Sequence, residues 1–306
     1  MQSASRRPMI AFVACSLIWG STFLVIKLGA DELAPLWAVC LRLVLAIAIL
    51  SILTAILKIP WPKGPFLKAA ALYGLLEFGG SFPLLYSAES KIPSGLGALV
   101  YATAPIWAML ESWVLGTETL NAKKLGAAAI SIAGVALIFL HEVTAGGSVI
   151  GLVLAVVSVI FATCAGQALS NQKQSAIAAN AVGAMVGLPV CLIISRLIGE
   201  SWALPATPVA WLPVIYLAVA GSVGAFVIFS WLITQWPVSS VCFVGVVVPV
   251  LAMILGAIVR HEPITATSVA GAALVIIGVV LVLRHQVTAD QPTNEESRPA
   301  DCPAAS

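Results

Sequence analysis

Apolar stretches of about twenty residues recur from one end of the chain to the other, and only short polar connections separate them. A transmembrane α-helix needs about 20 apolar residues, so each stretch is long enough to cross a bilayer. The sequence lacks the strict alternation over about ten residues that a membrane β-barrel requires. This pattern predicts an all-α integral membrane protein with ten transmembrane helices. The predicted spans are residues 9–28, 35–57, 66–88, 93–115, 122–140, 149–171, 177–198, 207–232, 238–259 and 266–284.

Composition and charge exclude several other classes of protein. Of the 306 residues, 60% are hydrophobic and only 9% are charged, whereas a soluble domain carries about 25% charged residues. The net charge is +2, and no basic patch suits nucleic acid. The six cysteines form no C-x-x-C pair, and the three histidines have no metal-ligand spacing. We therefore expect no metal site, no cofactor and no nucleic-acid partner.

The basic residues predict the orientation in the membrane. The first segment, MQSASRRPMIAFVACSLIWG, lacks the cleavage site of a signal peptide, so we interpret it as a retained first helix. With the N-terminus in the cytoplasm, ten Lys and Arg residues fall inside and four outside, which follows the positive-inside rule. Both termini are then cytoplasmic, and the polar tail 285–306 is expected to be disordered. The ten inside residues are Arg6, Arg7, Lys58, Lys63, Lys68, Lys123, Lys124, Lys173, Arg284 and Arg298.

The chain repeats itself after a shift of 144 residues, without a gap. Each half, residues 1–140 and 149–284, holds five spans, so the second half must enter the membrane in the opposite orientation. Many secondary transporters have such an inverted repeat and bind substrate at the midplane between the repeats. Chance similarity between apolar helices is the alternative. The matched pairs are Pro93 with Pro237, Pro105 with Pro249, Glu118 with Glu262, and Gly134 with Gly278.

Several short motifs resemble those of a known transporter family. They are WGSTFLVIK in the first span, LRL in the second, P-x10-G-T-E from Pro105 and P-x11-H-E from Pro249. These motifs are similar to those of the EamA family of the drug/metabolite transporter superfamily, and the resemblance covers nearly the whole chain. It implies ten helices in two inverted halves, a cell inner membrane location and export of small metabolites such as amino acids. The second half has VIFATCAGQALSN in place of WGSTFLVIK, so the two halves differ there.

A glutamate lies midway along the third span, in GLLEFGGSFP. A charge at that depth costs about 2.5–3.5 kcal/mol on insertion scales, so Glu77 should face the bundle interior or a wet cavity. Its helical neighbours Tyr73, Gly74, Gly80 and Ser81 form a small and polar face, which favours this orientation. Two compatible roles remain open for this carboxylate, and a chance position at the lipid edge is the alternative to both. It binds a cationic group or a proton, or it is the charge partner of Arg42 in the second span.

Other residues within the spans are candidates for a substrate site. Trp19 and Tyr101 are suited to stacking on an organic substrate, and Gln167 to donating hydrogen bonds, although core packing is the alternative for each aromatic residue. Glu111 and Glu118 lie near helix ends, where structural roles are expected. The predicted substrate-binding residues are Trp19, Tyr73, Glu77, Ser81, Tyr101 and Gln167. The predicted hinge residues are Gly79, Gly80, Pro83, Pro105 and Pro249, with close helix packing as the alternative for the glycines.

These features favour a secondary transporter that works by alternating access. A phosphate-binding loop of the form G-x-x-x-x-G-K-[ST] is absent from the sequence, and so is a legible cluster of catalytic groups, so we expect no ATP-driven pump and no enzyme. The expected partners are a small-molecule substrate, the lipid bilayer and, if the proton gradient drives transport, protons. We expect a monomer or a homodimer. A multidrug or quaternary-cation exporter and a non-transporting scaffold or sensor are the alternatives.

Overall fold

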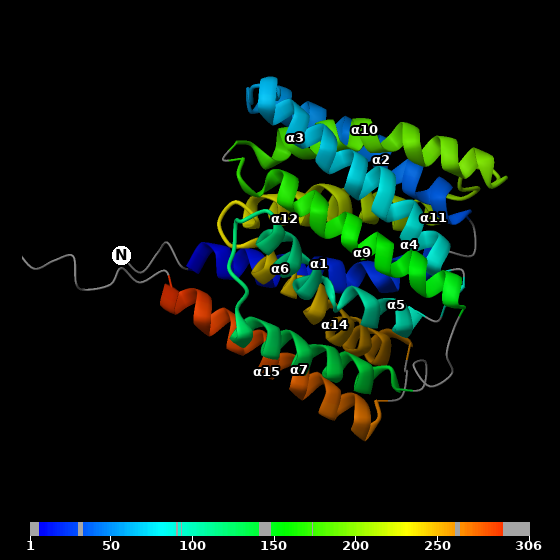
Figure 1. Cartoon of the computed structure of the whole chain (residues 1–306). Coiled ribbons are helices and arrows are strands. Elements are labelled where there is room, and N and C mark those ends of the chain that lie inside the picture. The colour runs from blue at the N-terminus through cyan, green and yellow to red at the C-terminus, as the bar shows by residue number, and fades with distance from the viewer. Residues whose placement is uncertain are drawn as a thin grey trace, which may run out of the picture.

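A computed structural model describes residues 6–29, 33–89, 91–92, 94–140, 148–172, 174–260 and 264–289. This part of the chain contains helices and no strand, and the helices form one bundle (Figure 1). The helices of the first half are α1 (Arg6–Gly29), α2 (Pro35–Ile56), α3 (Gly64–Gly74), η1 (Leu75–Ser81), α4 (Phe82–Glu89), α5 (Ser94–Tyr101), α6 (Ala104–Val114) and α7 (Ala122–Ile138). Those of the second half are α9 (Val149–Ser170), α10 (Ala176–Leu197), α11 (Pro208–Tyr216), η2 (Leu217–Ala225), α12 (Phe226–Leu232), α13 (Val238–Val241), α14 (Phe243–Arg260) and α15 (Ala266–Ala289).

Every predicted span corresponds to one helix or to two or three consecutive helices. Within the described residues, six helices are long and apolar enough to cross a membrane. The other four predicted spans correspond to α1, to the succession α3–η1–α4, to α5 with α6, and to α7. One boundary differs from the expectation, because α15 continues to Ala289 and residues 285–289 are helical. The rest of the predicted tail, 290–306, and the repeat residues Pro93 and Glu262 lie outside the described residues.

The start of α1 and the end of α15 lie on the same side of the bundle, at the left of Figure 1. The α2–α3 and α6–α7 connections lie on this side as well (Figure 1). We call it the chain-end side. It therefore carries Arg6 and Arg7 at the start of α1, Lys58 and Lys63 in the α2–α3 connection, and Lys123 at the start of α7. This clustering follows from an alternating path of the chain through the bundle.

The third span of each half contains a π-helix at a corresponding position. A shift of 144 residues moves η1, Leu75–Ser81, onto residues 219–225, which lie within η2. A π-turn bonds residue i to residue i+5, so it widens the helix and rotates the side chains that follow. Three of the predicted hinge residues lie in or beside this π-helix: Gly79 and Gly80 are within η1, and Pro83 follows it in α4.

The two prolines expected to interrupt helices in matching places lie in different local structures. Pro105 is in the first turn of α6, just after the break at Ala102 and Thr103. A proline costs little there, because its missing N–H would have no partner in the helix. Pro249 lies inside the continuous helix α14, where it removes one backbone hydrogen bond. Of these two prolines, Pro249 alone interrupts the hydrogen bonds of a helix interior.

Glycines allow α7 and α15 to pack with their backbones in near contact. A Cβ added at Gly134 of α7 would lie 2.6 Å from the Gly271 carbonyl oxygen and 2.9 Å from the Val275 backbone nitrogen. Close approach of this kind through small residues is a common way for helices to associate in membranes, where the hydrophobic effect does not drive them together. The same helix carries a second glycine, Gly126, where an added Cβ would meet no atom within 4 Å.

These two glycines of α7 provide a matched test of the packing. Gly134→Ala should destabilise the protein by about 1–3 kcal/mol, because backbone atoms of α15 cannot yield to the added methyl group. Gly126→Ala should be neutral or stabilise by up to about 1 kcal/mol through helix propensity. Thermal unfolding of the two variants in one detergent measures the difference. Equal midpoints for both variants would contradict the α7–α15 contact.

Candidate functional site

A cavity of about 180 Å³ lies among helices of both halves, and we call it the central cavity. Residues of α1, α2, η1, α4 and α5 line it from the first half, and residues of α12 and α14 from the second. Three of the predicted substrate-binding residues line it: Trp19, Glu77 and Tyr101. Arg42 and Pro249 line it as well. The fold thus brings five widely separated sequence positions to one cavity.

Glu77 reaches the cavity from the π-helix η1 and is only half-buried. Among the described residues, no side chain or backbone group forms a hydrogen bond or a close ion pair with its carboxylate. π-Helical turns often occur at functional sites, because they turn a side chain out of the regular α-helical register. A carboxylate without a protein partner beside a cavity is available to a ligand or a proton.

Arg42 lines the cavity from α2 and is 6% exposed. Its Nε donates a hydrogen bond of 2.8 Å to Ser222 Oγ in η2. Its guanidinium carbon lies 5.1 Å from the ring centroid of Phe82, which is a cation–π distance. Arg42 is therefore held by contacts from both halves of the chain, and it also lines the cavity wall.

Arg42 and Glu77 line the same cavity but do not form a direct ion pair. In the part of the chain that the structure describes, the one close ion pair joins Lys124 and Glu118, at 3.2 Å. The Arg42 and Glu77 charges do act on each other through space. The cavity thus holds one group of each sign that a ligand with two opposite charges can reach.

Aromatic rings form much of the remaining wall. Trp19 packs against Phe226 with ring centroids 5.2 Å apart at an angle of 70°, and Phe226 lies 5.8 Å from Phe82. Tyr101 lines the cavity, and its hydroxyl shares a hydrogen bond of 2.5 Å with Ser158 Oγ. Sequence analysis missed Phe82 and Phe226. A signal for Phe82 was available in the sequence: it lies four residues before Tyr86, which puts the two rings on one helix face. Phe82 and Tyr86 both line the cavity.

Three other predicted binding residues are not part of this cavity wall. Tyr73 is 1% exposed, and its hydroxyl donates to Asn180 Oδ1 at 3.0 Å. Ser81 is buried and forms hydrogen bonds with Tyr101 and Ser158, so it lies behind the wall. Gln167 donates to Ala108 O at 3.0 Å. Their polar groups have partners in the protein. Tyr73 does not line the cavity for a local reason. The π-helix that begins between Tyr73 and Glu77 rotates the two residues away from a common α-helical face.

The comparison with protein families matches the EamA-like transporter family twice, at residues 6–140 and at residues 146–284. The two matches together cover almost all of the described chain and divide it between α7 and α9. The chain belongs to the EamA-like transporter family.

Relatives of this EamA-like chain are named as transporters. It is 29% identical over 283 residues to the "Uncharacterized inner membrane transporter YedA" of Escherichia coli strain K12, with 89% of each chain covered. It is 25% identical over 291 residues to a "Probable amino-acid metabolite efflux pump" of Salmonella typhimurium, covering 90% of this chain and 95% of that one. A "Probable terminal-alkyne amino-acid exporter" of Streptantibioticus cattleyicolor is 24% identical over 278 residues, with 90% and 93% covered.

A solved structure has the same fold as this EamA-like chain. The two superpose with a TM-score of 0.73 over 93% of this chain and 99% of the other, at 18% sequence identity. At this identity the likeness concerns the arrangement of the helices.

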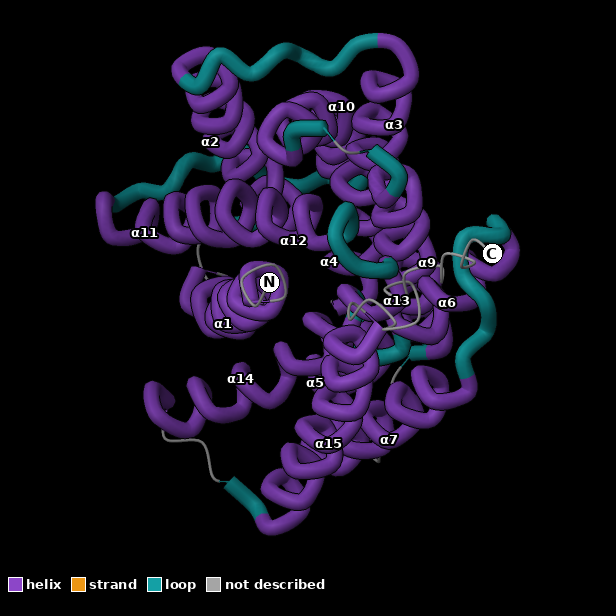
Figure 2. The backbone as a smooth tube through the Cα atoms, turned by 90° about the vertical axis from the view of Figure 1, so that its left-hand side faces the viewer, coloured by secondary structure: helices purple, strands orange, loops and turns teal. Residues whose placement is uncertain are grey.

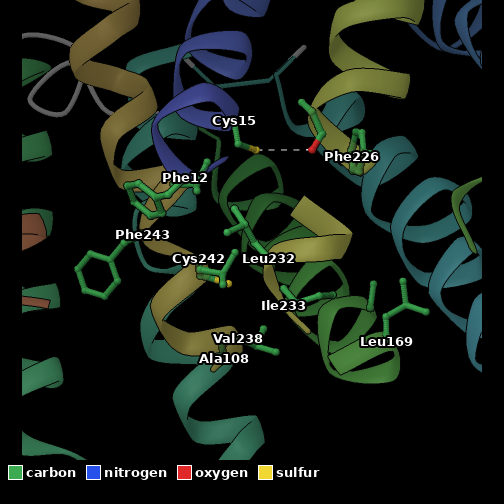
Figure 3. Packing of buried hydrophobic residues seen from close by; sticks show 14 of the residues in the cluster. Phe12, Cys15, Ala108, Leu169, Phe226, Leu232, Ile233, Val238, Cys242 and Phe243 are labelled. Atoms are coloured by element: carbon green, nitrogen blue, oxygen red, sulfur yellow. Dashed lines mark hydrogen bonds between the residues drawn. The ribbon is translucent and has the colours of Figure 1, made fainter. Parts of the chain in front are cut away.

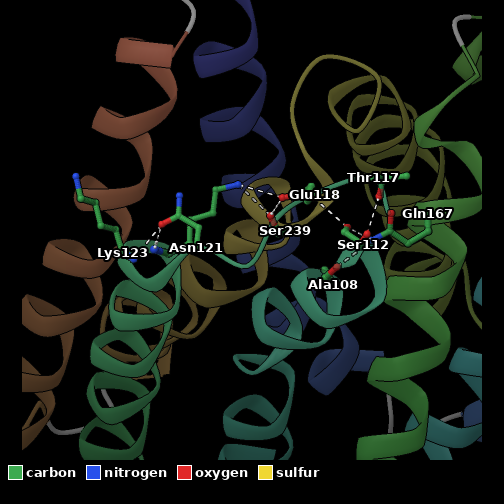
Figure 4. Close-up of polar contacts among 9 residues, drawn as sticks. Ala108, Ser112, Thr117, Glu118, Asn121, Lys123, Gln167 and Ser239 are labelled. Carbon is green, nitrogen blue, oxygen red and sulfur yellow. Dashed lines mark hydrogen bonds and ion pairs between the residues drawn. The ribbon is translucent and has the colours of Figure 1, made fainter. Parts of the chain in front are cut away.

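A polar cluster on the chain-end side of the EamA-like bundle joins residues of both halves (Figure 4). Glu118 accepts hydrogen bonds from Ser112 at 3.0 Å and from Ser239 at 2.6 Å, besides its ion pair with Lys124. Gln167 donates to Ser112 Oγ at 2.7 Å. Glu118, expected at a loop end, thus also links the α6–α7 connection to α13 and, through Ser112, to α9. We call these five residues the chain-end cluster.

Buried apolar residues of α1, α12 and α14 pack together in one core (Figure 3). Phe12 precedes Trp19 on α1, Leu232 follows Phe226 on α12, and Phe243 precedes the cavity residues of α14. Since α1 and α14 begin and α12 ends on the chain-end side, all three core residues lie nearer to that side than the cavity does. Each is at most 2% exposed. The three core residues therefore pack on the chain-end side of the cavity.

Gln167 tests whether the chain-end cluster stabilises the fold. Gln167→Leu should lower the stability by about 1 kcal/mol, because Ser112 loses a donor while the volume is nearly retained. Gln235→Leu is the matched control, since the Gln235 side chain is exposed and bonds only to the neighbouring Thr234. Thermal unfolding in detergent measures both. A control that loses as much stability as Gln167→Leu would contradict the assigned role.

Proposed function

We propose that this chain is a secondary transporter that exports small amino-acid-like metabolites across the inner membrane by alternating access. The observation that carries the proposal is the central cavity with Glu77 and Arg42 on its wall and no ion pair between them. The inner membrane location is supported by the relative named as an inner membrane transporter. Export of amino-acid-like solutes is supported by the two relatives named for amino-acid metabolites and for terminal-alkyne amino acids.

The two charges fit the two ends of a zwitterion. The ammonium group of an amino acid would bind Glu77, and its carboxylate would bind the guanidinium of Arg42, which suits carboxylates by its planar fork of donors. Each buried charge then gains a partner, which offsets the cost of removing the substrate from water. Trp19 and Tyr101 would contact the substrate's side chain.

Alternating access is supported by the arrangement of the two halves. We infer an inverted repeat from the shift of 144 residues, from the two family matches and from the π-helices at corresponding positions. We infer that the apolar core and the contacts of the chain-end cluster hold the two halves together on the chain-end side. Transport would require these contacts between the halves to separate while contacts form on the opposite side. The basic residues of the chain-end side favour a cytoplasmic location for both termini.

Proton coupling is proposed for Glu77. A carboxylate without a protein partner beside a cavity is able to exchange a proton and a cationic substrate at the same site. Export would then follow from proton entry, with the two species alternating on one carboxylate. The chain-end cluster has a second half-buried acid, Glu118, but its Lys124 and serine partners already satisfy it.

A quaternary-cation exporter is the second candidate. Trp19, Phe82, Phe226 and Tyr101 surround a single carboxylate, and aromatic faces recognise quaternary ammonium groups well. In that case Arg42 would act only as a structural residue, through Ser222 and Phe82.

Glu77→Gln should abolish stimulation of export by a pH gradient, because an amide does not take up a proton. Glu111→Gln is a matched control, since Glu111 lies outside the cavity wall and its carboxylate accepts a hydrogen bond from Thr163 that an amide oxygen can also accept. Proteoliposomes loaded with a panel of labelled amino acids, with and without a gradient, measure the flux. Full gradient-driven flux in Glu77→Gln would exclude the coupling.

Arg42→Gln distinguishes the two substrate classes. For a zwitterion the flux should fall by about ten-fold or more, because the carboxylate loses a charge-assisted partner. For a quaternary cation the flux should be retained in folded protein. A double-mutant cycle that combines Arg42→Gln with Glu77→Gln measures the coupling energy between the two residues. Strictly additive losses would contradict a substrate that bridges both charges.

A further inference from the structure

Helix α9 supports the wall of the central cavity without being part of it. It lies beside α4 (Figure 2) and packs on the π-helix η1. None of the described residues that line the cavity is on α9. A shift of 144 residues places α9 over α1, which does reach the cavity through Trp19 and Thr22. The first helices of the two halves therefore relate to the cavity in different ways.

Ser158 of α9 joins a closed network of three hydroxyl groups. Its Oγ lies 2.5 Å from the Tyr101 hydroxyl and 3.0 Å from Ser81 Oγ. The Tyr101 hydroxyl in turn lies 3.1 Å from Ser81 Oγ. Ser158 is 0% exposed and Ser81 is 1% exposed, whereas Tyr101 is half-buried and lines the cavity. The network thus connects a cavity residue of α5 to buried residues of η1 and α9.

The protons of this network determine which group donates to which. Ser158 Oγ donates its single proton to the Ser81 carbonyl oxygen at 2.9 Å. A hydroxyl group has one proton and two acceptor lone pairs, so the serine oxygen accepts at its contact with Tyr101 and the phenol donates. The O–H bond of a phenol lies in the plane of the ring, because its oxygen is conjugated with the ring. A fixed acceptor therefore fixes the rotation of the Tyr101 ring as well as its hydroxyl.

The same serine contacts the π-helix that carries Glu77. Ser81, whose carbonyl accepts the Ser158 proton, is the last residue of η1 and lies four residues after Glu77. A Cβ added at Gly80 would collide with the Phe161 ring of α9, so η1 lies tightly against α9 at this point. This packing leaves the Ser81 carbonyl little room to move away from Ser158.

We propose that Ser158 is a positioning residue of the substrate site, which orients Tyr101 at the cavity wall through the hydrogen bond that the phenol donates. The inference rests on the proposed function, in which Tyr101 contacts the side chain of the substrate. Because Ser158 is fully buried, removal of its hydroxyl leaves the phenol facing a position where water does not replace the lost acceptor. A helix of the second half thus shapes a part of the wall that the first half provides.

The orientation of Tyr101 is measured by 19F NMR of the full chain in detergent, with its four tyrosines replaced by 3-fluorotyrosine. Tyr101→Phe identifies the Tyr101 signal by its loss. Ser158→Ala should shift or broaden this signal, because the phenol loses its acceptor and the ring gains other orientations. Ser170→Ala is the matched control and should leave the signal in place, since Ser170 is also on α9 and donates to the Gln167 carbonyl of its own helix. An unchanged Tyr101 signal in Ser158→Ala would overturn the positioning role.

Transport kinetics in proteoliposomes test what this orientation does for the substrate. The probes are radiolabelled L-alanine, L-leucine and L-phenylalanine, and KM is measured for the one that the wild-type protein carries fastest. Ser158→Ala should raise this KM by about five-fold or more with little change in kcat, since a contact with the bound substrate is displaced. In the Tyr101→Phe background the same change should alter KM by less than about two-fold, because the residue through which Ser158 acts has already lost its hydroxyl.

The two backgrounds separate positioning from a merely structural role. An equal rise of KM in both would mean that Ser158 acts through the Ser81 carbonyl, and it would overturn the role in orienting Tyr101. If Ser158→Ala does not fold, Tyr101→Phe gives the reading from the other partner: it should raise KM to a similar extent, and an unchanged KM would overturn the inference. Absence of flux for all three probes in the wild-type protein would contradict the proposed export of amino acids, and the 19F signal alone would then decide whether Ser158 orients Tyr101.

Discussion

The fold and the proposed activity both depend on how this chain accommodates charge at membrane depth. A charged side chain in the hydrocarbon region needs a partner, water or a ligand. Arg42 meets this requirement with Ser222 and the Phe82 ring, whereas Glu77 has only the cavity. The acid is thus left for something that is not part of the protein. Where the chain needs a stable closure, as at Glu118, the same kind of group is paired and hydrogen-bonded from several sides.

The positions of the spans could be predicted from the sequence because hydropathy directly reflects the requirement for about 20 apolar residues in a bilayer. Glu77 and Trp19 could be selected because charged and large aromatic side chains stand out in such spans. Tyr73 was predicted to bind substrate, but it does not line the central cavity, for a physical reason. Its spacing from Glu77 indicates a shared face only in an α-helix, and the π-helix that begins at Leu75 changes the number of residues per turn.

Packing between helices determines which candidate residues reach the cavity, and the sequence alone does not show this packing. Gln167 is a polar residue within a predicted span, as a binding residue would be. It lies near the end of α9, and its amide donates hydrogen bonds to Ala108 O and Ser112 Oγ. Phe226 has nothing in its local sequence that distinguishes it from other buried rings, and it reaches the cavity because α12 packs beside α1. Sequence patterns identify which residues are chemically able to form a site. Which of them meet depends on contacts between helices more than a hundred positions apart.

The bond from Arg42 to Ser222 has an electrical consequence. Arg42 belongs to α2 and Ser222 to η2, so a rotation of one half against the other either breaks this bond or carries a full positive charge along with it. A charge displaced through part of the bilayer does work against the membrane voltage, about 2.3 kcal/mol for a complete crossing at 100 mV. In the second case the conformational equilibrium would respond to voltage, even when the solute that the protein carries has no net charge.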